Sequence, residues 1–150
     1  MVRDDINNAL KQAMKAKDAR RVSCLRLMNA AIQDKDIEAR GAGKSALSDD
    51  ELLGLFQKMI KQRQESAELY DKGARPELAA AERAEIEIIT AYLPKQMSDT
   101  EAGSAISSLL NEINAETMKD MGRAMAALKE RFAGKMDFAK ASGMVKELLK

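Results

Sequence analysis

The sequence predicts an all-α fold: an N-terminal helical hairpin or bundle of about four helices, followed by a small C-terminal three-helix domain. Residues that favour helices are abundant, chiefly Ala, Leu, Met, Lys, Glu and Gln. Runs of Val or Thr of the kind that strands need are almost absent. We therefore expect no sheet. The chain has 150 residues, enough for one ordinary domain or two small ones.

Helix start signals place the first three elements. A first helix is expected over Asp4–Lys17, and a second from Asp18, which can cap its N-terminus, to about Arg40. The run Ser48-Asp-Asp-Glu51 has the spacing of a capping box, in which the serine and glutamate side chains each bond the other's backbone NH. A long third helix should follow that box and end at Lys72, before a glycine.

Proline and a second capping box place the remaining elements. Pro76 favours the start of a fourth helix, because its missing NH would be unsatisfied there anyway, and Pro94 ends that helix. The run Ser98-Asp-Thr-Glu101 repeats the capping-box spacing directly afterwards. We therefore predict an N-terminal helical domain over residues 1–95 and a C-terminal three-helix domain over residues 96–150.

Apolar residues at helical spacing predict the core. Cys24 sits among them and is expected to serve packing rather than chemistry. The other residues expected inside are Val22, Leu25, Met28, Ile32, Leu52, Phe56, Met59, Ile60, Ala67, Tyr70, Leu78, Ile86, Ile89, Leu93, Ala102, Ile106, Leu109, Ile113, Met118, Met121, Met125, Leu128, Phe132, Phe138, Val145 and Leu148.

Composition excludes several classes of function. The chain is 45% hydrophobic and 33% charged and lacks a long apolar run, so we expect a soluble globular protein with no membrane partner. It has no histidine and one cysteine, which removes the usual catalytic imidazole, zinc sites built on Cys and His, and a disulfide within the chain. We expect no metal and no cofactor. The N-terminus lacks the features of a secretory signal, so we also expect a cytoplasmic location.

Two other patterns are weak candidates for chemistry. Gly43-Lys44-Ser45 looks like the tail of a phosphate-binding loop, but the earlier glycine and the preceding strand of that motif are missing, so a connector is expected. Glu82 and Glu85 would be needed as acid and base in a free-standing enzyme. Ion pairs with neighbours such as Arg83 on a helix surface explain them better.

Local excesses of positive charge are the strongest candidate binding features. The formal net charge is only +1, so any site for a polyanion must be local. A solvated helix face is the alternative explanation for each excess. The C-terminal excess comprises Lys119, Arg123, Lys129, Arg131 and Lys135, and a possible secondary basic patch comprises Lys11, Lys15, Arg20 and Arg21.

Helical geometry supports the C-terminal group. At about 100° per residue, Lys119 and Arg123 fall opposite the apolar stripe that begins at Met118, where they can meet phosphates. The chain has only two tyrosines and three phenylalanines, so stacking on single-stranded bases is poorly supported. Folded RNA recognised by shape and phosphate fits better, and we expect no DNA partner.

Five short pieces in a fixed order carry a family resemblance. They are CLRLMNAAIQ around Arg26, KQRQES from Lys61, GAR from Gly73, YLPKQ from Tyr92 and MGRAM from Met121. Together they resemble the stand-alone YqeY proteins, which are similar to the tail of the GatB subunit of tRNA-dependent amidotransferases. The resemblance covers essentially the whole chain and implies an all-helical protein with a small C-terminal three-helix domain.

The resemblance also implies a function. The amidotransferase is a carbon–nitrogen ligase that converts misacylated glutamyl- or aspartyl-tRNA to the amide with glutamine as amido-N-donor, and its tail contacts tRNA while the chemistry lies elsewhere. By resemblance this chain is a non-catalytic tRNA-associated adaptor, possessing the Gly134-Lys135-Met136-Asp137 pattern of that tail. The alternative is a protein–protein interaction module that docks a cytoplasmic partner, such as an amidotransferase or a synthetase.

Overall fold

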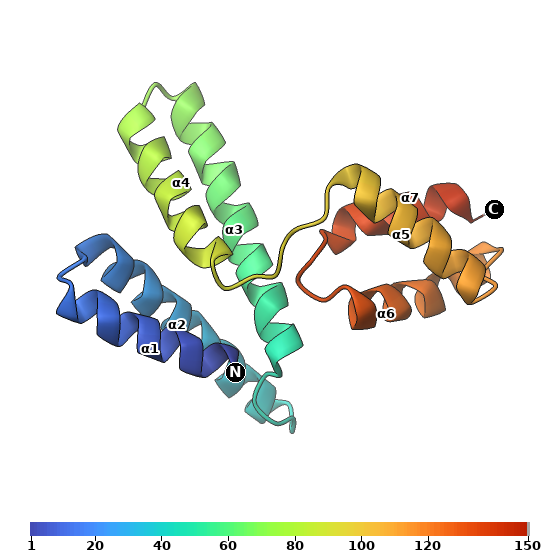
Figure 1. The fold of residues 1–150 in the computed structure, drawn as a ribbon, viewed down its shortest axis with the longest axis horizontal. Coiled ribbons are helices and arrows are strands. Elements are labelled where there is room, and N and C mark those ends of the chain that lie inside the picture. The colour runs from blue at the N-terminus through green and yellow to red at the C-terminus, as the bar shows by residue number, and fades with distance from the viewer. Residues whose placement is uncertain (150) are drawn as a thin grey trace. The chain divides into compact units, whose positions relative to one another are not determined.

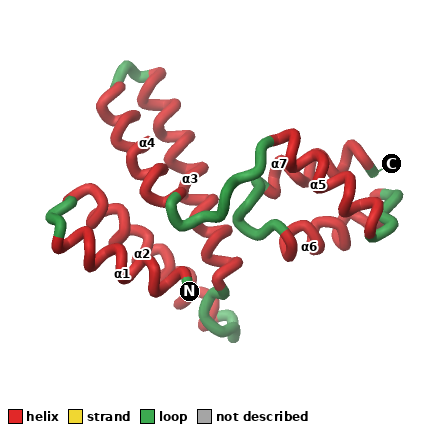
Figure 2. Tube along the Cα trace, in the orientation of Figure 1, coloured by secondary structure: helices red, strands yellow, loops and turns green. Residues whose placement is uncertain are grey.

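The structure, a computed structural model, describes residues 1–149, and these residues form helices and loops without a strand (Figures 1 and 2). The all-α prediction is confirmed. The helices of the described residues are α1 (Val2–Lys15), α2 (Ala19–Gly41), α3 (Asp49–Lys72), α4 (Pro76–Thr90), α5 (Asp99–Glu112), α6 (Met121–Arg131) and α7 (Phe138–Leu148), with a 3-10 turn, η1 (Met118–Asp120), before α6.

The chain divides into two compact units, which we call the N-terminal unit (Met1–Leu93) and the C-terminal unit (Pro94–Lys150). In the N-terminal unit α1 and α2 form one antiparallel hairpin, and α3 and α4 form another (Figure 1). In the C-terminal unit α5 packs against both α6 and α7. Each unit has its own apolar core, so each can be described by itself.

Helices α2, α3 and α5 begin where the capping signals in the sequence predict. Asp18 accepts a hydrogen bond from the backbone NH of Arg21 at the start of α2. The capping boxes of Ser48 and Ser98 are both formed, so α3 and α5 begin directly after them. These bonds satisfy donors that a helix N-terminus otherwise leaves unpaired.

Most predicted core positions are buried or half-buried, and most of the buried ones lie in the two separate cores. In the N-terminal unit Phe56 and Ile89 are fully buried, together with Cys24 and Leu52. In the C-terminal unit the fully buried side chains include Ile106, on α5. Because helical spacing puts one face of each helix inward, the apolar pattern identifies this face before the partners are known.

Three core predictions are wrong, because Leu78, Met118 and Leu148 are exposed. Met118 lies in η1 rather than in the α-helix that the sequence predicted, so the spacing of about 100° per residue does not apply there. In the other two cases the next residue along is buried instead: Ala79 in the first turn of α4, and Leu149, where the chain leaves α7.

Candidate nucleic-acid interface

The five C-terminal candidate cations all lie exposed on and around α6. Lys119 belongs to η1, Arg123 lies in the first turn of α6, and Lys129 and Arg131 lie in its last turn. Lys135 follows in the turn before α7. Their side chains differ in what they contact.

Arg123 holds the C-terminal end of α5. Its Nη1 donates to the carbonyl of Ile113, the C-cap of α5, at 2.6 Å, and its Nη2 donates to Asp120 Oδ1 at 3.1 Å. A positive group next to the last carbonyls of a helix is favourable. The pKa of Asp120 is lowered, first by the backbone NH groups of Glu116 and Thr117 and then by Arg123. Arg123 therefore has a structural role, although its side chain stays 54% exposed.

Arg131 contacts the same helix. Its Nη2 donates to Glu112 Oε1 at 2.7 Å, and its Nη1 donates to the second carboxylate oxygen. This two-bonded pairing lowers the pKa of Glu112 and raises that of Arg131. The Arg131 side chain is 47% exposed, so solvent screens the pair and its contribution to stability is small.

The other three cations carry no such pairing. Among residues 1–149 the side chains of Lys119, Lys129 and Lys135 make no ion pair. Helix geometry places Arg131 about 80° from Arg123 around α6, and Lys129 about 120° away on the other side. The two arginines thus face the α5 side and the lysine does not, so the predicted group does not form one continuous face of α6.

The backbone at Lys135 is held by the segment that precedes α5. Gly134 adopts the left-handed conformation with φ 73°, which a side chain would disfavour. Gln96 Nε2 donates to the carbonyl of Gly134 at 2.5 Å, and the NH of Met97 donates to the carbonyl of Lys135 at 2.8 Å. Asp137 then caps α7. The Lys135 side chain therefore projects from a turn whose backbone is fixed on both sides.

The secondary basic patch lies at the α1–α2 turn. Lys11 and Lys15 are exposed on α1, Arg20 is exposed on α2, and the neighbouring Arg21 is half-buried. Within the described residues none of these four side chains makes an ion pair. This patch belongs to the N-terminal unit, whereas the α6 cations belong to the C-terminal unit.

Of the two glutamates considered for acid–base chemistry, Glu85 lies in an ion pair. Glu85 on α4 accepts a hydrogen bond from Arg63 Nε on α3 at 2.8 Å, so its carboxylate is an ion-pair partner. Arg83 pairs with Asp71 and not with a neighbouring glutamate, which corrects the pairing expected from the sequence.

Cys24 is fully buried, and burial, followed by the charge of Glu85, raises the pKa of its thiol to about 11. It is a packing residue, as predicted.

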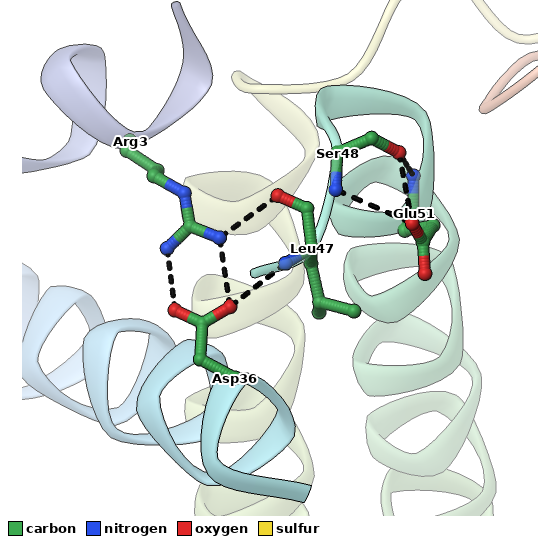
Figure 3. A network of polar contacts seen from close by, with 5 residues as sticks. All are labelled: Arg3, Asp36, Leu47, Ser48 and Glu51. Atoms are coloured by element: carbon green, nitrogen blue, oxygen red, sulfur yellow. Dashed lines mark hydrogen bonds and ion pairs between the residues drawn. The ribbon is translucent and has the colours of Figure 1, made fainter. Parts of the chain in front are cut away.

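Sequence reasoning missed the polar contacts between distant residues. Arg3 and Asp36 form a doubly hydrogen-bonded ion pair that also holds Leu47, next to the capping box of Ser48 and Glu51 (Figure 3). This network anchors the end of the loop that contains the glycine-rich run. No local spacing signals such a pair, because its members are 33 residues apart.

Two further classes of site are absent from the described residues. Between residues 1 and 149 no group of three or more His, Cys, Asp or Glu side chains is arranged to hold a metal ion. None of the helices described is both long and apolar enough to cross a bilayer.

Comparison with known proteins gives a family match over nearly the whole chain. A family model described as Yqey-like protein matches residues 3–149. The chain is also similar to the protein "Altered inheritance of mitochondria protein 41, mitochondrial". It is 36% identical over 111 residues to that of Lachancea thermotolerans, which covers 73% of this chain and 58% of the relative. For Vanderwaltozyma polyspora the identity is 32% over 118 residues, or 75% and 62% of the two chains.

These relatives bear on the predicted cellular location of this chain and on its length. They are named mitochondrial proteins, which contradicts the predicted cytoplasmic location. That prediction was wrong because an unpaired cysteine and a non-secretory composition do not distinguish one reducing compartment from another. The chain spans less than two thirds of the length of these two relatives.

Proposed function

This chain belongs to the YqeY family, and from that premise we propose that it is a non-catalytic, tRNA-associated adaptor whose C-terminal unit contacts folded RNA. The observation that carries the proposal is that three lysines on and around α6, Lys119, Lys129 and Lys135, are exposed and make no ion pair within the described residues. We further propose a division of labour, with a four-helix N-terminal part and a three-helix C-terminal part that bears the RNA contacts.

The proposed mechanism is electrostatic. An ammonium group at the end of an exposed side chain can approach a phosphate without breaking an existing pair, and phosphate contacts position a protein without reading sequence. Lys135 is suited to this, because its backbone is fixed by the bonds to Gln96 and Met97 described above. Folded RNA presents phosphates and 2′-hydroxyls in a defined shape, so fixed cations can select that shape.

The two arginines contribute in a second way. A guanidinium carries five N–H donors, and Arg123 and Arg131 each use two of their nitrogens on α5 or Asp120. Both side chains remain about half exposed in spite of these bonds, so they can also approach phosphates. We therefore keep both arginines in the proposed interface, as residues that also hold α5.

No amidation chemistry is assigned to this chain. Transfer of the amide nitrogen of glutamine belongs to the catalytic parts of the amidotransferase that the family resembles. An adaptor would act together with such an enzyme, or with a synthetase, by holding the tRNA that they share. This partnership is part of the proposal.

The test is filter binding of bulk tRNA at two salt concentrations. The informative variant is Lys119→Glu with Lys135→Glu, because neither side chain makes an ion pair and the fold should survive. The matched control, Lys61→Glu with Lys72→Glu, makes the same charge change on α3. If the three lysines and two arginines contact phosphates, wild-type affinity should fall about 130- to 500-fold between 50 and 200 mM salt.

The two variants should behave differently. We expect the Lys119/Lys135 variant to bind tRNA much more weakly at low salt and to lose about two fifths of the salt dependence, since two of the five proposed contacts are removed. The α3 control should retain wild-type binding. Equal binding by the wild type and both variants would remove the RNA function from the C-terminal unit.

A further inference from the structure

Helix α2 carries apolar residues on two opposite faces. Its inner face buries Leu25, Met28 and Ile32 in the core of the N-terminal unit. Its outer face carries Leu27, which is 48% exposed, and Ile37, which is 65% exposed. A helix that is apolar all round is normally covered all round. Within its own unit α2 packs against α1, α3 and α4, and this packing leaves Leu27 and Ile37 exposed.

The outer face of α2 contains an open hollow of about 430 Å³. Five α2 residues line the hollow: Ala19, Val22, Ser23, Arg26 and Leu27. Their spacing is i, i+3, i+4, i+7 and i+8, which is the spacing of one continuous helix stripe. Ile37 lies five helical turns after Ala19 and so on the same line, which gives the face a length of about 27 Å.

Among the described residues, the one charged side chain that lines the hollow is positive, that of Arg26. From Ala19 to Gln33 the sequence contains three arginines and no acidic residue. None of the side chains of Arg20, Arg21 and Arg26 makes an ion pair within the described residues, and Arg26 lines the hollow itself. The nearest acid in the sequence, Asp18, accepts the cap bond of α2. At about 100° per residue, Arg20 falls beside Leu27 at the edge of the hollow, whereas Arg21 falls on the opposite side of α2. The surface is thus an apolar hollow with Arg26 in its lining and Arg20 at its edge.

We propose that this α2 outer face, defined by Ala19, Val22, Ser23, Arg26 and Leu27, binds an acidic amphipathic helix of a partner protein. Leucine-type side chains of that helix would enter the hollow beside Leu27, as ridges of one helix enter the grooves of another. Its glutamates or aspartates would meet Arg26 and Arg20, and such charge complementarity sets orientation and speeds encounter.

Two other occupants fit this surface less well. A second copy of the chain would bring Arg26 and its neighbours towards the same arginines in a two-fold contact, which is repulsive. RNA would suit the charge, but Ala19, Val22 and Leu27 offer an apolar lining without an aromatic ring for a base to stack on. The proposal goes beyond the RNA contact and does not depend on it, since all its residues lie in the N-terminal unit.

The test uses the full chain and a fluorescent synthetic helix of about 20 residues, long enough to follow the α2 face. The probe peptide has leucines at i, i+3, i+4 and i+7 and glutamate at most other positions. One control peptide scrambles that sequence, and another replaces each glutamate with lysine. We expect fluorescence anisotropy to show binding of the patterned acidic peptide, with at least about tenfold weaker binding of both controls.

Variants of the chain locate the contact. Leu27→Ser should weaken binding about tenfold, because it removes the apolar side chain beside the hollow. Arg26→Glu should weaken binding by a similar factor at low salt and by less at high salt. The matched controls are Leu69→Ser, which changes a leucine 67% exposed on α3, and Lys61→Glu, and both should bind as the wild type does. Circular dichroism melting confirms that all four variants fold.

Three outcomes would overturn the proposal. The first is equal affinity for all three peptides, or unchanged binding by both Leu27→Ser and Arg26→Glu. The second is displacement of the peptide by tRNA together with loss of tRNA binding in Arg26→Glu, which would assign the face to RNA. The third is a dimer in sedimentation velocity that Leu27→Ser abolishes, which would assign the face to a second copy of the chain.

Discussion

Arg3 and Asp36 are joined by two parallel hydrogen bonds: Nη1 to Oδ2 at 2.7 Å and Nη2 to Oδ1 at 2.8 Å (Figure 3). Both residues also bind the backbone of Leu47. Arg3 Nη2 donates to its carbonyl at 2.9 Å, and Asp36 Oδ1 accepts from its NH at 3.0 Å. The pair therefore ties α1, α2 and the residue before the α3 capping box into one arrangement.

Asp36→Asn should lower the melting temperature at pH 7, because Arg3 would lose the charge of its partner. Arg3 and then the NH of Leu47 lower the pKa of Asp36 from 3.8 to about 2. Since the folded-state pKa lies below the unfolded one, the carboxylate stabilises the fold above pH 3.8, and this contribution is lost as the pH falls through 2.

The measurement is thermal melting of the wild type and Asp36→Asn from pH 7 to pH 2. The difference in melting temperature should be full above pH 3.8 and should shrink as the pH falls from 3.8 towards 2. Asp34→Asn, an exposed residue on the same helix, is the control and should change little. A constant difference across this range would show that the charge of Asp36 is not what stabilises the contact.

Arg123→Ala should destabilise the C-terminal unit by about 1 kcal/mol, because it removes the hydrogen bond to the last carbonyls of α5. Lys119→Ala, four residues earlier and exposed, should leave stability within about 0.5 kcal/mol of the wild type. Urea unfolding of the two variants measures both values. Equal stability of both would mean that Arg123 is as free in solution as Lys119.

Cys24 should resist thiol reagents in the folded protein. Its side chain is fully buried, and its pKa of about 11 leaves little thiolate at neutral pH. Titration with a chromogenic disulfide at pH 8 should give almost no reaction before unfolding and one equivalent afterwards, since the chain has one cysteine. Cys24→Ala provides the baseline. Rapid, complete reaction in native buffer would show that α2 opens easily.

Ile106→Ala should destabilise the C-terminal unit by about 2–5 kcal/mol, because it removes a fully buried side chain of that core. The two units have separate cores, so amide exchange in α1–α4 should remain protected while α5–α7 exchange faster. Leu69→Ala, at an exposed apolar position, is the control. Equal acceleration throughout the chain would show that the units unfold together.

The elements and cores were predictable because their signals are local. Ser48 with Glu51, and Ser98 with Glu101, specify helix starts within four residues of chain. The inward positions of α3 follow from spacing alone, since Leu52, Phe56 and Met59 recur on one helical face. Prediction was wrong at Met118, where a 3-10 turn replaces the first turn of the expected helix.

The candidate interface was predictable only as a list of cations. The sequence gives the number and positions of the charges. Whether a cation is unpaired depends on which groups pack beside it in the fold. Arg123 and Lys119 are similar in the sequence, since both are cations near the start of α6. Arg123, however, donates to the carbonyl of Ile113, ten residues away, whereas Lys119 makes no ion pair with any described residue. Nor does the sequence reveal that Gln96 fixes the turn that bears Lys135.

By itself the sequence determined the helices, their inward faces, the absence of histidine chemistry and the family, because these depend on residue type and short spacing. Tertiary structure alone decided which charges are paired, as in Arg3 with Asp36 and Arg63 with Glu85, and that the outer face of α2 stays uncovered in its unit. Such contacts depend on how helices that are far apart in the sequence approach one another in space. Short-range sequence patterns do not determine that approach.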